Sequence, residues 1–153
     1  MLPGCGLHPL YAGGGSGPVA AALAGVEVAP IEGRGGWLIA NALRQRFAAD
    51  GQTPRYRLDV KLDDQIAGLG VRGDDSVVRE RRILRARYQL VDAGSGTVVL
   101  DATAGSDAGI DVVGSEYATI AAENTAQERL ADIVADQIVA RVAVYARRAA
   151  AQP

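Results

Sequence analysis

The sequence predicts an α+β fold, a two-layer sandwich in which a mostly antiparallel four-stranded sheet carries two helices on one face. Two segments, 55–63 and 79–91, alternate between apolar and charged residues, as half-buried strands do. A long C-terminal segment instead repeats its apolar residues at helical spacing. The expected order of elements is β-α-β-β-β-α, and a length of 153 residues suits one domain.

The first two elements are expected between residues 23 and 49. Val26 and Val28 alternate around a charged residue, so Leu23–Ile31 is interpreted as a strand. The glycine-rich segment 32–36 is interpreted as a turn. A helix is then predicted over Trp37–Ala49, because apolar residues recur there at every fourth position.

The next three strands are expected to form an antiparallel meander. Even positions in 55–63 are apolar and odd positions are charged, but the pattern slips afterwards, which indicates a bulge or turn near Asp63–Asp64. The runs Val77–Val91 and Thr97–Ala104 flank a short glycine-containing loop and predict a hairpin. With one apolar face per strand, the helices are needed on only one side of the sheet.

The last element is predicted to be a helix over Ser115–Arg148. Ser115 suits the N-cap position, glutamates come early in the segment and arginines come late, as the helix macrodipole favours. About 34 residues would span roughly 50 Å. Since this exceeds what a small sheet covers, we expect the helix either to project or to be kinked.

Composition limits the classes of function. The formal net charge is −2, with 16 basic and 18 acidic residues, which does not favour a nucleic-acid binder. Hydrophobic residues make up 48% of the chain, enough for a core, yet no run reaches the length of a membrane-spanning helix. Cys5 is the only cysteine, so no intramolecular disulfide can form.

The sequence contains few residues suited to catalysis or metal binding. His8 is the only histidine and precedes a flexible glycine-rich stretch, so a catalytic triad or a metal site lacks partners. The carboxylate pairs Asp63–Asp64 and Asp74–Asp75 suit solvated loops. Segment 33–36 lacks the Lys-Ser/Thr ending of a phosphate-binding loop, which favours a plain turn. We therefore expect no enzymatic activity and no cofactor.

One cluster of arginines stands out from the rest of the sequence. Five arginines lie within 79–87, and four of them occupy odd positions, so they project from the same face of one strand. These four, called the arginine strip, are the candidate anion-binding residues: Arg79, Arg81, Arg85 and Arg87. Arginine forks match phosphate and carboxylate oxygens. The alternative is a solvated face balanced by acids such as Asp59, Asp63 and Asp101.

The N-terminal residues suggest a lipid anchor. Leu2–Cys5 resembles a lipobox, in which the cysteine becomes the acylated first residue of the mature protein. A glycine-rich linker follows. The expected organisation is a lipid-anchor head and linker over 1–18, one α/β domain over 19–149 and a disordered tail over 150–153.

The chain also resembles the LptE family of lipopolysaccharide-assembly lipoproteins, notably its alphaproteobacterial branch. The resemblance lies in the start 5–11, in 37–43 of the first helix, in 56–60 of the second strand and in 115–119. It implies a lipoprotein held by Cys5 on the periplasmic side of the outer membrane, plugging the β-barrel LptD and helping to deliver lipopolysaccharide. The arginine strip is a candidate for lipopolysaccharide binding on physical grounds alone.

Two other functions remain open at this point. Small periplasmic α/β lipoproteins also serve as accessory subunits of ABC-type lipid transport systems. An unanchored domain that binds a small molecule would instead need a concave apolar pocket. The partner of the protein, a β-barrel or an inner-membrane permease complex, distinguishes the LptE-like role from the transport-accessory role. An unanchored binding domain would keep its location when Cys5 is replaced by serine.

Overall fold

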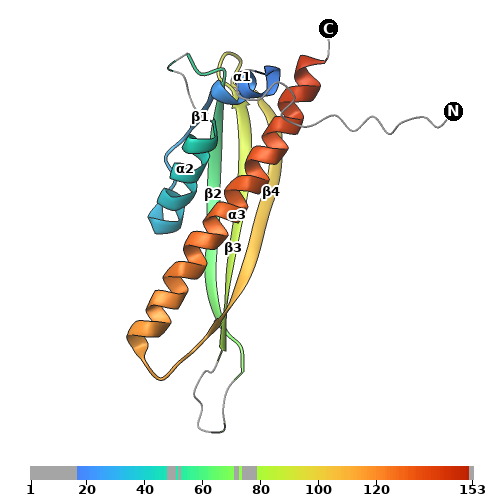
Figure 1. The fold of residues 1–153 in the computed structure, drawn as a ribbon. Coiled ribbons are helices and arrows are strands. Elements are labelled where there is room, and N and C mark those ends of the chain that lie inside the picture. The colour runs from blue at the N-terminus through green and yellow to red at the C-terminus, as the bar shows by residue number, and fades with distance from the viewer. Residues whose placement is uncertain (1–16, 48–50, 52, 71–72, 74–78, 152–153) are drawn as a thin grey trace, which may run out of the picture.

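The computed structural model describes residues 17–47, 51, 53–70, 73 and 79–151. It confirms the α+β class and the four-stranded sheet with helices on one face (Figure 1), and it adds one short helix at the start. The elements are α1 (Pro18–Ala24), β1 (Val26–Val28), α2 (Gly33–Phe47), β2 (Tyr56–Gly68), β3 (Arg79–Asp92), β4 (Val98–Asp111) and α3 (Glu116–Ala150).

The sheet has the strand order β1-β2-β3-β4 and is mixed rather than wholly antiparallel. β2, β3 and β4 form the predicted antiparallel meander, whereas the short β1 lies at the edge and pairs in parallel with β2. In the register, Leu58 lies opposite Leu90, and Leu90 lies opposite Leu100. Apart from Val98, which lies beyond a register shift at Leu90–Val91, even-numbered residues of the three long strands therefore point to one face and odd-numbered residues to the other.

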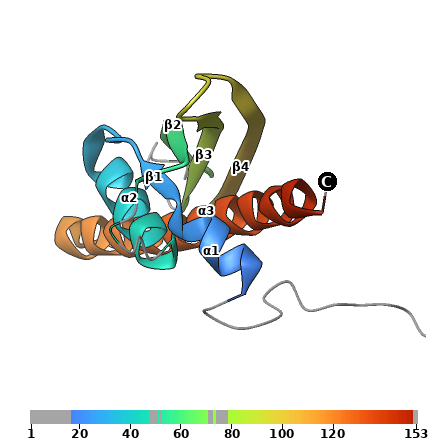
Figure 2. The same cartoon turned by 90° about the horizontal axis from the view of Figure 1, so that it is seen from above.

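The core lies between the even face of the sheet and the helical layer. α3 runs obliquely across β3 and β4, and α2 packs beside it over β1 and β2 (Figures 1 and 2). The predicted apolar stripe of α2, which includes Ile39, Leu43 and Phe47, is buried in this layer. Side chains of α3 pack against the sheet, among them Val134 and Ile138, which are fully buried.

The prediction of a strand over Leu23–Ile31 was largely wrong. Residues 18–24 form α1 instead, and only Val26–Val28 pair with β2. The segment is rich in alanine, the best helix former, and Pro18 occupies the first helical position, where its fixed φ is favourable. The alternation around Glu27 correctly indicated a strand but not its length.

The predicted turn over 32–36 is also corrected, because α2 already begins at Gly33. Gly35 and Gly36 are buried in its first turn. A Cβ on Gly36 would lie only 2.6 Å from the backbone oxygen of Ile31, so the incoming chain packs directly on this residue. These glycines permit close packing and leave no open loop for a phosphate.

The strands are longer and more regular than predicted. β2 continues through Asp63 and Asp64 without a bulge, and the register shift lies instead at Leu90–Val91. β3 and β4 have 14 residues each, so they extend about 45 Å. This length gives α3 a long surface to pack on, and α3 runs for 35 residues as one helix. Ser115 caps its N-terminus, as predicted.

Candidate anion-binding site

The arginine strip lies on the face of the sheet opposite the helices. Arg79, Arg81, Arg85 and Arg87 are all exposed and project from the odd positions of β3. The fifth arginine of this segment, Arg82, projects from the other face toward α3. Strand alternation therefore sorts the five arginines as the sequence predicted.

Aspartates of β4 neutralise three of the four strip arginines. Arg79 lies 3.3 Å from Asp111, Arg81 lies 2.9 Å from Asp107 and Arg87 lies 3.1 Å from Asp101. We call these three pairs the Arg–Asp ladder. Hydrogen bonds to Asp107 and Asp101 raise the pKa of Arg81 and Arg87, and the same bonds lower the pKa of both aspartates.

The acids that balance the strip are mostly not those expected. Of the three named from the sequence, only Asp101 pairs with a strip arginine. Asp59 binds Arg57 on its own strand, and Asp63 accepts a hydrogen bond from Gln65. Asp107 and Asp111 were missed because the predicted strand ended at residue 104, short of both.

The ladder is interrupted at Arg85. Its neighbour across the strand pair is Gly105, which has no side chain, and the next odd position toward Asp101 is Thr103. Within the described residues Arg85 forms no ion pair. Its positive charge still helps to lower the pKa of Asp107, although the hydrogen bond from Arg81 contributes most to that shift.

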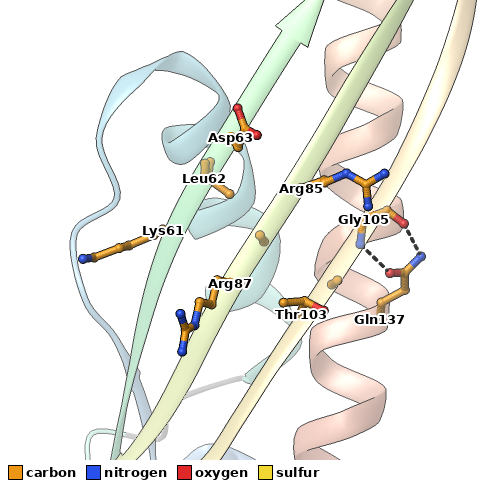
Figure 3. Close-up of a pocket in the computed structure, with 10 residues that line it drawn as sticks. Lys61, Leu62, Asp63, Arg85, Arg87, Thr103, Gly105 and Gln137 are labelled. Atoms are coloured by element: carbon orange, nitrogen blue, oxygen red, sulfur yellow. Dashed lines mark hydrogen bonds between the residues drawn. The ribbon is translucent and has the colours of Figure 1, made fainter.

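A hollow of about 440 Å³ lies at this interruption (Figure 3). Three cationic side chains border it: Arg85, Arg87 and Lys61, whose position on β2 is opposite Arg87. Thr103 adds a hydroxyl group, and Asp63 is the one acid in its lining. We call this region the Arg85 hollow. Sequence reasoning missed Lys61 and Thr103 because the register between strands is not visible in the sequence.

The backbone beside the hollow is held by α3. Gln137 accepts a hydrogen bond from the Gly105 N–H at 3.0 Å and donates one to the Gly105 carbonyl at 3.3 Å (Figure 3). Its amide therefore replaces a neighbouring strand at this edge of the sheet. A Cβ at Gly105 would lie 3.3 Å from the Cγ of Arg85, so glycine leaves room for the arginine stem.

Arg82 belongs to a separate polar cluster between the sheet and α3. Its Nε and Nη2 atoms donate to the two carboxylate oxygens of Asp64 at 2.8 and 2.7 Å, and Gln127 donates to Asp64 at 2.7 Å. Its Nη1 atom reaches the Glu123 carbonyl oxygen. The side chains of Arg82 and Asp64 are only 12% and 20% exposed. Asp64 is thus a strand residue whose carboxylate is largely covered by its partners, not the solvated loop residue expected from the sequence.

Other sequence-based candidates lie outside the described residues, among them Cys5, His8 and Asp74–Asp75. Among the residues that the structure does describe, no group of three or more metal-ligating side chains comes together. No described helix is long and apolar enough to cross a membrane.

The solved structures that share this fold include three bacterial lipoproteins. A candidate lipoprotein from Caulobacter crescentus is 25% identical, with a TM-score of 0.71 over 86% of this chain and 98% of that one. The minor lipoprotein of Acinetobacter baumannii is 15% identical (TM-score 0.60, 78% and 91% covered), and rare lipoprotein B of Shewanella oneidensis is 11% identical (TM-score 0.58, 82% and 96% covered). The fold is therefore one that bacterial lipoproteins adopt. No curated protein sequence matches the chain.

Residues 23–142 match the LptE family, which is described as lipopolysaccharide-assembly. The match covers most of the chain, so the protein belongs to the LptE family. This assignment confirms the resemblance in the sequence, and the family is one of lipopolysaccharide assembly.

Proposed function

We propose that this protein is anchored through an acylated Cys5 on the periplasmic side of the outer membrane, where it plugs an LptD-type β-barrel and assists delivery of lipopolysaccharide to the outer leaflet. Membership of the LptE family supports this role. Two or more acyl chains on Cys5 would supply the stable anchoring that one chain cannot.

We further propose that the Arg85 hollow binds the phosphate or carboxylate groups of lipopolysaccharide. The observation that supports this most is the interruption of the Arg–Asp ladder at Arg85. Arg85 lies opposite Gly105 on β4 and Asp63 on β2 and forms no ion pair within the described residues, so its fork stays available for an incoming anion. Lys61 lies on the same rim and adds a second positive charge without requiring a fixed geometry.

The ladder gives the strip arginines different roles in this proposal. Arg79 and Arg81 are held by aspartates and mainly stabilise the pairing of β3 with β4. Arg87 pairs with Asp101 yet borders the hollow, so a bound anion and Asp101 would share its guanidinium group. By replacing the divalent cations that bridge lipopolysaccharide molecules, Arg85 and Lys61 would weaken their aggregation while the lipid is transferred.

The test compares lipopolysaccharide binding by Arg85→Ala and Arg81→Ala, two exposed arginines on the same face of the same strand. Losing one charge-assisted contact at Arg85 should weaken binding roughly 10- to 100-fold. Arg81→Ala should change it by less than about threefold, since Asp107 already occupies that guanidinium. Thermal unfolding of each variant checks that the fold is intact. Equal losses in the two variants, or none, would reject the Arg85 hollow as the binding site.

A further inference from the structure

The two described ends of the domain lie at the same end of the molecule. α1 packs against α3, and the last turn of α3 lies beside the ends of the strands where β2 begins (Figure 1). The opposite end of the sheet, where β4 leads into α3, is the far tip. The molecule therefore has one end close to its N-terminal segment and one distant from it.

Three arginines from two layers of the fold gather at the end near the N-terminal segment. Arg147 and Arg148 are exposed in the last turn of α3, and Arg55 is exposed just before β2. Aromatic contacts bring them together: the Arg55 guanidinium lies 5.2 Å from the centre of the Tyr56 ring, which meets Tyr145 edge to face at 6.0 Å. Tyr145 lies one helical turn before Arg148. We call Arg55, Arg147 and Arg148 the basic end.

No ion pair neutralises the basic end within the described residues, and the nearby carboxylate of Asp92, whose pKa is lowered by hydrogen bonds from Ser95 and also by the charge of Arg55, offsets only part of its charge. None of its three arginines forms an ion pair there, in contrast to Arg57, which binds Asp59 further along β2. The neighbouring Asp92 accepts hydrogen bonds from the Ser95 and Gly94 backbones, which hold the β3–β4 turn. The end therefore presents an excess of positive charge to its surroundings.

The helix macrodipole explains only part of this arrangement. Arginines in the last turn of a helix are favoured by the partial negative charge of its carbonyl groups, which accounts for Arg147 and Arg148. It does not account for Arg55, which precedes a strand in the other layer. A cluster drawn from both layers at one end fits a flat anionic partner better than local helix stabilisation.

Chain length indicates which surface that partner is. Eleven residues lie between Cys5 and Gly17, so the twelve steps of chain from an anchor at Cys5 hold this end within about 40 Å of the membrane. The far tip lies about 50 Å from this end, the length of α3. If Cys5 is acylated, as proposed above, the basic end is the part of the domain held nearest the lipid headgroups.

We propose that the basic end docks on the anionic phospholipid headgroups of the membrane in which the protein is anchored. Arg55, Arg147 and Arg148 bind their phosphates electrostatically. This contact would hold the end of the domain that carries α1 and the last turn of α3 at the periplasmic leaflet, where the proposed acyl anchor also lies. The acyl anchor and the basic end together would then fix both position and orientation.

The test uses the anchorless full chain, Cys5→Ser, so that docking is measured independently of acylation and of lipopolysaccharide. It is titrated with phosphatidylcholine vesicles that contain either 40% or no phosphatidylglycerol, at low salt, and bound protein is measured by sedimentation. Each arginine near an anionic surface strengthens partitioning about fivefold, so Arg147→Gln/Arg148→Gln should weaken it about 25-fold and Arg55→Gln about fivefold. Half-molar salt should abolish it.

Arg44→Gln/Arg129→Gln is the matched control, because it removes two exposed helical arginines that lie away from this end and form no ion pair among the described residues. It should change partitioning by less than twofold. The proposal is overturned if the anionic vesicles bind no better than neutral ones, or if both double variants lose binding equally. A loss of partitioning in Lys61→Ala/Arg85→Ala would also overturn it by assigning the membrane contact to the Arg85 hollow. The proposed transport role is tested separately by lipopolysaccharide binding.

Discussion

Replacing Asp64 by asparagine should destabilise the domain by removing the charge that compensates Arg82. Asp64 lies on the helix-facing side of β2 and accepts three hydrogen bonds, two from Arg82 and one from Gln127. Asparagine has nearly the same shape but keeps only one acceptor oxygen and no charge. Arg82, whose side chain is 12% exposed, would then lack its counter-charge.

The size of this effect follows from how buried the pair is. Removing one partner of a fully buried ion pair costs about 3–5 kcal/mol. Because both side chains keep some contact with water and asparagine retains an acceptor, we expect about 2–3 kcal/mol. For a domain of this size, that corresponds to a decrease in Tm of about 4–12 °C. Circular dichroism during thermal and urea unfolding would measure it.

The pH dependence gives a second reading of the same contact. Burial raises the pKa of Asp64, but the hydrogen bonds from Arg82 and Gln127 outweigh it, so the pKa lies below its ordinary value of 3.8. The stabilisation is therefore complete well above pH 3.8 and is lost as the pH falls through the lowered folded-state pKa. Asp64→Asn should remove this acid-dependent part, and its stability should converge with that of the wild type in acid.

Asp63→Asn is the matched control, one residue away on the exposed face. Asp63 accepts a hydrogen bond only from Gln65 among the described residues, so its replacement should cost less than about 0.5 kcal/mol. Equal stabilities of the two variants at neutral pH would refute the view that the polar cluster ties α3 to the sheet.

Three further predictions concern neighbouring features. Burial and the nearby Glu123 raise the pKa of Glu80, so ionisation of Glu80 opposes folding. Glu80→Gln should therefore be more stable than the wild type in urea at pH 7, and this advantage should shrink toward pH 4. The control Glu116→Gln should show no such gain in stability. Gly36→Ala gains about 1 kcal/mol of helix propensity but meets the Ile31 carbonyl, so a net loss of about 1–2 kcal/mol is expected in thermal unfolding; unchanged or higher stability would mean that the chain at Ile31 yields freely. Gln137→Ala leaves the backbone of Gly105 at the edge of β4 without its hydrogen bonds. The variant should lose about 1 kcal/mol of stability and self-associate more strongly in analytical ultracentrifugation. A strictly monomeric, fully stable variant would contradict this prediction.

Much of the fold could be predicted from the sequence, because periodicity directly reports which residues face the core. The structure confirms the strands predicted from the alternation around Leu58 and Leu90, and it confirms the helix predicted from the apolar spacing of α2. The errors arose where the pattern is locally ambiguous. The strand at Val26–Val28 was extended back to Leu23 because the alternation begins directly after it, although the alanine-rich stretch favours a helix. The end of β4 was missed because Ala104–Asp111 contains small and polar residues that give no clear alternation.

The candidate site was only partly visible in the sequence for a different reason. Alternation on one strand sufficed to collect Arg79, Arg81, Arg85 and Arg87 on one face. Which of them pairs depends on the register and on diagonal contacts with β4: Arg81 and Arg87 also lie opposite residues without a carboxylate, but each reaches an aspartate two positions along, whereas Arg85 forms no ion pair within the described residues. Register is set by tertiary packing and turn geometry, so a single sequence cannot distinguish the free arginine from the paired ones.

The central proposal, a lipoprotein plug of the lipopolysaccharide-assembly barrel, is tested most directly by purification of the tagged full-length protein from detergent-solubilised outer membranes. Co-purifying proteins are identified and quantified by mass spectrometry. We predict recovery of a large LptD-type β-barrel in a 1:1 ratio, about one barrel per chain. Recovery of a permease and an ATPase in its place, or of no stoichiometric partner, would contradict the proposal.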